Sequence, residues 1–128
     1  MQVISVVDDD ASVRAATVDL LDSAGVTCQA FASAEAFLAS GWLARTSCLI
    51  LDVRMPGLSG IDLAHKLVQT GHSIPVIFIT AFPQDRIRAQ ATAPGAICCL
   101  VKPYRDDELL GCIGLALGTA QDDCGSST

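Results

Sequence analysis

The stretch "MQVISVVDDD" (residues 1–10) joins an apolar run to three consecutive acids. Residues 3–7 form a short, largely apolar run, which is typical of a strand in the core. Carboxylates this close repel one another, so each of the three acids disfavours the ionised form of its neighbours. The stretch therefore predicts a core strand that ends in an electrostatically unfavourable loop.

Short apolar runs of the same kind alternate with amphipathic stretches along the rest of the chain. The expected strands are residues 3–7, 26–32, 48–51, 75–80 and 97–101. The expected helices are residues 12–24, 34–43, 61–70, 85–93 and 105–117. Five consecutive strand–helix units predict an α/β fold, a doubly wound parallel sheet of five strands in the order 2-1-3-4-5, flavodoxin-like (βα)5. Ligands bind such sheets at the carboxyl ends of the first and third strands.

The length of 128 residues suits one domain, which we expect to span residues 1–118, followed by a polar tail or linker at residues 119–128. No apolar run reaches the roughly 18 residues of a membrane span. No basic region precedes the apolar N-terminal stretch, as it does in a secretory signal. The net charge of −6, without a Lys/Arg cluster, disfavours direct nucleic-acid binding. We therefore expect a cytoplasmic protein that binds neither membranes nor nucleic acid.

Five of the six cysteines lie inside apolar segments, and the sequence contains no CxxC pair. This pattern favours buried, reduced thiols over a disulfide framework. His65 and His72 have no Cys or His around them at zinc-ligand spacing, so a zinc site is not expected.

Acidic residues end two strands that the expected order makes neighbours. Asp8 and Asp9 follow the first strand, and Asp52 closes the third, about 5 Å away across the sheet. A hard divalent cation would relieve the repulsion among the three acids, and Mg²⁺ prefers such oxygen ligands. Asp10, taken alone, is more simply interpreted as a helix N-cap.

The last two strands bring a hydroxyl and an ammonium group to the same edge of the sheet. Thr80 ends the fourth strand and Lys102 follows the fifth. Together with Mg²⁺ they could hold the oxygens of a phosphoryl group. A carboxylate can act as the nucleophile that forms an aspartyl phosphate, and Asp52 is the candidate.

Four motifs, taken jointly, resemble the receiver domain of bacterial two-component response regulators over about residues 2–118. The motifs are "VVDDD" (6–10), "LDVRMPGLSG" (51–60), "IPVIFITAF" (74–82) and "LVKPY" (100–104). The sequence looks most like receivers that precede a helix-turn-helix output domain. The resemblance implies a phosphoacceptor switch, not a turnover enzyme, that receives its phosphoryl group from a sensor histidine kinase or a phosphotransfer protein.

The resemblance also implies a role for each acid at the site. Asp52 would be phosphorylated. Asp9 would bind Mg²⁺ directly and Asp8 mainly through water, and the backbone carbonyl of Arg54 would complete the protein ligands. Lys102 would pair with Asp52 or with the phosphoryl oxygens, and its peptide bond to Pro103 would be cis.

The switch region departs from the family pattern at one position. Thr80 would swing toward the phosphoryl group, but Cys99 stands where the family carries a switch aromatic. The signal is therefore expected to run through Thr80 and the loop that begins at Ala81. Residues 85–117 form the expected surface for a homodimer or a target protein. Arg54 and Phe82 occupy positions that tune the lifetime of the phosphoryl group in this family, and a long lifetime is expected.

Three other classes of protein share part of this pattern. A haloacid-dehalogenase-like phosphatase needs a second Asp two residues after its nucleophile, where this chain has Arg54. A flavodoxin-like electron carrier would have its flavin phosphate repelled by the three N-terminal acids. A receiver-like interaction module that works without phosphorylation would normally lack Asp52, the acid pair or Lys102, and all of them are present.

Overall fold

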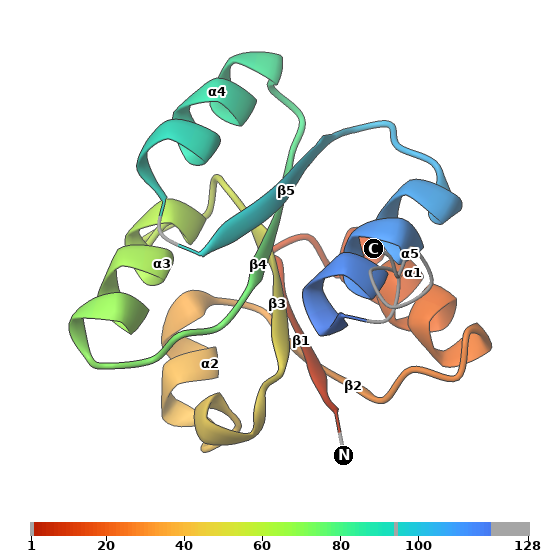
Figure 1. The fold of residues 1–128 in the computed structure, drawn as a ribbon, viewed down its shortest axis with the longest axis horizontal. Coiled ribbons are helices and arrows are strands. Elements are labelled where there is room, and N and C mark those ends of the chain that lie inside the picture. Colours follow the sequence, from red (N-terminus) through yellow and green to blue (C-terminus); the bar gives the residue numbers. More distant parts are fainter. Residues whose placement is uncertain (1, 94, 119–128) are drawn as a thin grey trace.

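The protein is a single parallel sheet covered by helices on both faces, and the computed structural model describes residues 2–93 and 95–118 (Figure 1). The strands are β1 (Ile4–Val7), β2 (Cys28–Phe31), β3 (Cys48–Asp52), β4 (Val76–Thr80) and β5 (Ala96–Val101). The helices are α1 (Ala11–Ser23), α2 (Ala34–Ala39), the 3-10 turn η1 (Leu43–Arg45), α3 (Gly60–Gln69), α4 (Pro83–Thr92) and α5 (Asp106–Leu117). The strand order is β2-β1-β3-β4-β5, so the predicted fold class is confirmed.

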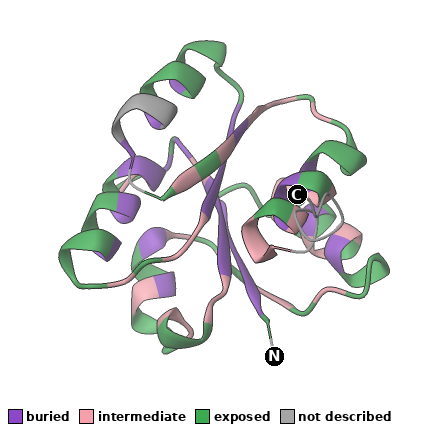
Figure 2. Cartoon of the chain, viewed as in Figure 1, coloured by how far each residue is buried: buried purple, intermediate pink, exposed green. Residues whose placement is uncertain are grey.

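The helices form two layers. Figure 1 shows α1 and α5 on one side of the sheet and α2, α3 and α4 on the other. Every residue of β1 and β4 is buried, whereas β2 and β5 at the two edges are mostly half-buried (Figure 2). The long apolar runs of the sequence therefore mark the strands that both helical layers cover.

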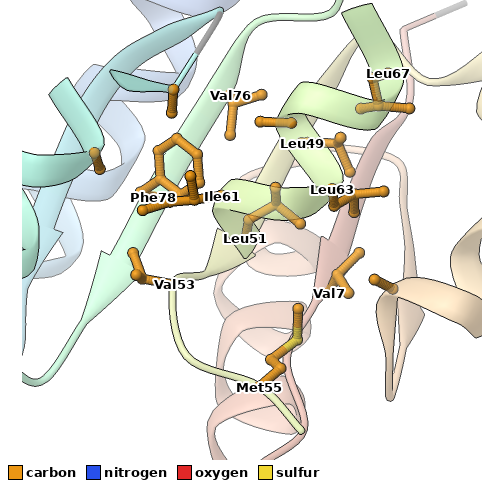
Figure 3. Packing of buried hydrophobic residues seen from close by; sticks show 14 of the residues in the cluster. Val7, Leu49, Leu51, Val53, Met55, Ile61, Leu63, Leu67, Val76 and Phe78 are labelled. Atoms are coloured by element: carbon orange, nitrogen blue, oxygen red, sulfur yellow. The ribbon is translucent and has the colours of Figure 1, made fainter. Parts of the chain in front are cut away.

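Each layer encloses its own hydrophobic cluster. The cluster on the side of α2–α4 contains Phe78, Leu49, Leu51 and Leu63, which pack face to face between the sheet and α3 (Figure 3). The cluster on the side of α1 and α5 contains Ile4, Ile50, Ile77 and Leu109, among others. Alternate residues of one strand thus serve opposite clusters, as the two-residue period of a strand requires.

The second helix is shorter than the sequence suggested. It was expected over residues 34–43, but α2 ends at Ala39 and a separate 3-10 turn follows. Gly41 has a φ of 82°, in the left-handed region, which interrupts the helix. The Ser40 hydroxyl donates to the carbonyl of Phe37 at 2.7 Å and so satisfies a group that the ended helix leaves open.

The cysteines follow the expected pattern in part. All five in the described part of the chain are free thiols. Cys48, Cys99 and Cys112 are buried, whereas Cys28 and Cys98 are only half-buried. Cys124 and the predicted tail at residues 119–128 lie outside the described residues. Within the described residues, none of the helices combines the length and the apolar character that crossing a bilayer requires.

Candidate functional site

The sheet register brings the three predicted acids together. Val7 of β1 lies opposite Leu51 of β3, so the residues that follow them leave the sheet side by side. Carboxylate oxygens of Asp8, Asp9 and Asp52 all lie within 4.8 Å of one another. Asp8 is buried, Asp52 is half-buried and Asp9 is exposed. We refer to these three residues as the acid triad.

The acid triad is costly in its ionised form. Burial, reinforced by the charge of Asp8, raises the pKa of Asp52 to about 7. Burial also raises the pKa of Asp8. The positive charge of Lys102 acts in the opposite sense and lowers the pKa of both carboxyl groups, but it does not outweigh burial. Three convergent carboxylate oxygens fit a hard divalent cation such as Mg²⁺.

The start of α1 fixes the orientation of Asp8. Asp10 is the N-cap of α1, and its carboxylate accepts hydrogen bonds from the backbone N–H groups of Ser12 at 2.9 Å and Val13 at 3.2 Å. The N-cap interpretation of Asp10 is therefore confirmed. The Asp10 N–H in turn donates to Asp8 Oδ1 at 2.9 Å, and Arg14 donates to the Asp8 carbonyl at 2.7 Å. Asp10 therefore caps α1 with its side chain and orients Asp8 with its backbone N–H.

The loop between β3 and α3 is held close to Asp52. A side chain at Gly60 would collide with the Asp52 carbonyl, so only glycine fits there. Ser59 caps α3 in a reciprocal pair with Asp62. On the other side of the loop, Glu35 of α2 accepts from the Leu58 N–H at 3.1 Å. These contacts fix the course of the loop that carries the Arg54 carbonyl.

Thr80 and Lys102 reach the same edge, as the sequence predicted. Thr80 ends β4 and is 1% exposed. The Lys102 N–H donates to the Thr80 carbonyl at 2.8 Å, which joins the two strand ends. The Lys102–Pro103 peptide bond is cis, so that expectation is confirmed.

Sequence reasoning missed Asp85, the third residue of α4. Its carboxylate accepts from the Thr80 hydroxyl at 2.8 Å and from Arg54 Nε and Nη2 at 2.7 and 3.1 Å. Arg54 also stacks over the Phe82 ring, with its central carbon 3.9 Å from the ring centroid. An acid in the first turn of a helix usually faces solvent, so the sequence carries no signal for this inward orientation.

Cys99 occupies the predicted switch position beneath α4. It is 4% exposed and belongs to the hydrophobic cluster on the side of α2–α4, together with Ala89 and Ala93. Ile97, beside the register shift between β4 and β5, is 42% exposed. The small thiol therefore fills a core position.

Comparison with known proteins agrees with this geometry. The profile of the response regulator receiver domain matches residues 4–113. The response regulator protein TmoT of Ectopseudomonas mendocina is 43% identical over 118 residues, which are 92% of this chain and 54% of TmoT. The chain spans about half the length of the curated relatives it matches.

Solved structures show the same fold. The response regulator StyR superposes with a TM-score of 0.82 at 38% identity, over 97% of this chain and 63% of StyR. The response regulator TrrA of Thermotoga maritima, solved in complex with Mg²⁺ and BeF, has a TM-score of 0.80 at 26% identity, over 91% of this chain and 100% of TrrA. The family match covers most of the chain, so this protein belongs to the response regulator receiver domain family.

Proposed function

We propose that Asp52 is the phosphoacceptor of this receiver domain and that the acid triad binds Mg²⁺ beside it. The observation that carries the proposal is the convergence of the acid triad with Thr80 and Lys102 at one edge of the sheet. The donor of the phosphoryl group would be a sensor histidine kinase or a phosphotransfer protein. The TrrA complex with Mg²⁺ and BeF supports the assignment by analogy.

The chemistry needs Asp52 as a carboxylate. One of its oxygens attacks the phosphorus of a phosphohistidine, an O–P bond forms, the N–P bond breaks, and the imidazole nitrogen keeps the electron pair. The pKa of about 7 leaves Asp52 only partly ionised near neutral pH in the metal-free protein. Bound Mg²⁺ would supply positive charge for the carboxylates and the phosphoryl oxygens.

The remaining roles follow from position. Asp8, Asp9, Asp52 and the Arg54 carbonyl would hold the cation. Lys102 would neutralise a phosphoryl oxygen, since its charge already acts on both Asp8 and Asp52.

Thr80 and Ala81 would carry the change toward α4, past Cys99. The surface around residues 85–117 would then meet a second copy or a target protein. Two apolar side chains support that choice, because Ile87 is 74% exposed and Ile97 is 42% exposed.

We further propose that residues 1–118 make up the receiver domain, which works in the cytoplasm without contacting nucleic acid or membranes itself. It would catalyse its own phosphorylation and slow dephosphorylation but would not turn over a substrate. The second candidate, an interaction module that works without phosphorylation, remains the alternative that an experiment has to remove.

Acetyl phosphate with Mg²⁺ provides that experiment. Mass spectrometry of the intact protein should show one added phosphoryl group in the wild type and in Asp106→Asn, which alters an exposed acid of α5. The group should be absent in Asp52→Asn and from samples that contain EDTA. Incorporation that survives Asp52→Asn would overturn the assignment, and a wild type that accepts no phosphoryl group would favour the alternative.

A further inference from the structure

Asp85 is a buried carboxylate that the proposed phosphoryl chemistry does not use. It lies in the first turn of α4, where an acid ordinarily faces solvent and favours the positive end of the helix dipole. Its side chain is only 3% exposed, and its hydrogen bonds go to Arg54 and Thr80. A buried carboxylate needs hydrogen-bond partners, so the role of Asp85 depends on the groups that it binds.

The contacts of Asp85 occupy the donors that a phosphoryl group would need. Thr80 donates its hydroxyl proton to Asp85 Oδ2 at 2.8 Å. A hydroxyl carries one proton, so Thr80 cannot donate to a phosphoryl oxygen at the same time. Arg54 gives two further donors to the same carboxylate, in the fork geometry that makes an Arg–carboxylate pair strong.

These side chains form one unit that links separate segments. Arg54 lies in the loop after β3, and Thr80 ends β4. Phe82 directly precedes α4, and Asp85 belongs to α4. Phe82 covers the Arg54 guanidinium at 3.9 Å, and its N–H donates to Thr80 Oγ1 at 3.1 Å. Moving Thr80 therefore disturbs all four. We refer to these four residues as the Asp85 cluster.

We propose that Asp85 is a positioning residue that holds the Thr80 hydroxyl and the Arg54 guanidinium in the unphosphorylated protein and releases both when Asp52 carries a phosphoryl group. The proposal rests on the phosphorylation of Asp52 proposed above. Arg54 lies next to the acid triad, because its backbone N–H donates to Asp52 Oδ1 at 3.3 Å.

A phosphoryl group on Asp52 adds negative charge and acceptor oxygens at that point. These oxygens compete with Asp85 for the same two donors. Release would remove the side-chain hydrogen bonds that link Asp85 of α4 to Arg54 and Thr80. Phosphorylation would thereby act on the surface of α4 without an aromatic residue at position 99.

The first test needs no phosphorylation. Hydrogen exchange of the arginine Nε–H groups, followed by NMR in the free protein, compares Arg54 with Arg105. Arg105 pairs with Asp107 at 3.1 Å, but both of those side chains are about three-quarters exposed. We expect the Arg54 Nε–H to exchange about tenfold more slowly than that of Arg105 and to lose this protection in Asp85→Ala. Equal rates in the wild type would overturn the proposal.

The second test measures the affinity for beryllium fluoride, a phosphoryl mimic, at saturating Mg²⁺. Asp85→Ala should bind it about tenfold more tightly than the wild type, because the mimic no longer competes with Asp85. Asp85→Asn keeps an acceptor for Thr80 and loses the ion pair, so its affinity should lie between the two. Asp107→Ala removes the exposed partner of the other Arg–Asp pair and should leave the affinity unchanged. Amide spectra confirm that each variant is folded.

Equal or weaker binding by Asp85→Ala would overturn the release step. Equal affinities in Asp85→Asn and Asp85→Ala would show that charge alone acts, and would remove the role assigned to Thr80. If the wild type and Asp52→Ala have the same affinity for beryllium fluoride, the proposed function of Asp52 is refuted instead. In that case the arginine exchange still decides whether Asp85 holds its partners.

Discussion

Two clusters of charged residues lie near the carboxyl edge of the sheet, and they shift the pKa of their acids in opposite directions. In the acid triad, burial and mutual repulsion raise the pKa of Asp8 and Asp52. In the Asp85 cluster, hydrogen bonds from Arg54 hold the pKa of Asp85 below its usual range, although that carboxylate is also buried. The first cluster carries more negative charge than Lys102 offsets and is suited to a cation, whereas the carboxylate of the second is already paired with Arg54 and Thr80.

Removing one charge from each cluster should therefore have opposite effects. In the acid triad, replacing one carboxylate by a neutral side chain relieves the repulsion among the acids and removes an oxygen that would bind the cation. In the Asp85 cluster, removing the charge of Asp85 weakens its bonds to Arg54 and Thr80 and relieves no repulsion.

The largest effect is expected for Asp52→Asn in the metal-free protein. The folded state raises the pKa of Asp52 from 3.8 to about 7, so the native state holds a proton that the unfolded chain has lost. The stability that Asp52 contributes is present below about pH 4 and is lost as the pH rises toward 7. Asp52→Asn should thus match the wild type near pH 4 and exceed it in free energy of unfolding above pH 7 by about 2 kcal/mol. This is roughly half of what a pKa shift of that size corresponds to, because water screens a half-buried carboxylate.

Urea unfolding of both proteins in EDTA, at a series of pH values, measures that difference. A difference that stays constant with pH would contradict the raised pKa. Asp106→Asn serves as the exposed control and should show no growing advantage.

The next effect concerns Mg²⁺ affinity. Asp9→Asn removes a proposed direct ligand and should weaken Mg²⁺ binding about tenfold, as a titration followed by amide NMR shifts would show. Asp85→Asn removes the same charge near the same edge, but from the Asp85 cluster, and should leave the affinity nearly unchanged. A similar loss in both variants would mean that overall charge, not ligation, controls binding.

A smaller effect is expected on the stability of the free protein from Asp85→Ala. The buried hydroxyl of Thr80 would lose its acceptor, which costs about 1 kcal/mol in free energy of unfolding. Asp107→Ala breaks an exposed Arg–Asp pair and should change stability very little. Denaturant unfolding of the two variants side by side tests the claim, and equal losses would count against it.

The smallest effect is on the lifetime of the phosphoryl group. Arg54 and Phe82 stack on each other in the free protein, so we expect them to act together. Phe82→Glu and Arg54→Asn should each speed the decay of phosphorylated protein severalfold, and the double variant should gain less than the product of the two effects. Decay at the wild-type rate in both single variants would show that neither side chain controls the attacking water.

The acid triad could be predicted from sequence because strand ends fix it. A continuous apolar run followed by an acid sets both the end of a strand and the position of the carboxylate, as for Asp8 and Asp52. The Asp85 cluster could not be predicted in this way, because it depends on which way long side chains turn. Nothing in the spacing of Arg54 and Asp85, 31 residues apart, indicates that the two would meet.

The end of α2 was missed for a related reason. The apolar pattern of residues 34–43 continues past Ala39, but the left-handed backbone at Gly41 breaks the helix. A periodic pattern specifies which face is buried and does not specify where the backbone changes conformation.

One measurement tests the relation between the two clusters most directly. Amide and arginine side-chain spectra of the wild type are recorded without ligand and with Mg²⁺ and beryllium fluoride. Binding at Asp52 should shift the signals of Thr80 and of α4 and should remove the exchange protection of the Arg54 Nε–H. Shifts confined to the surroundings of Asp52, with Arg54 still protected, would contradict the account.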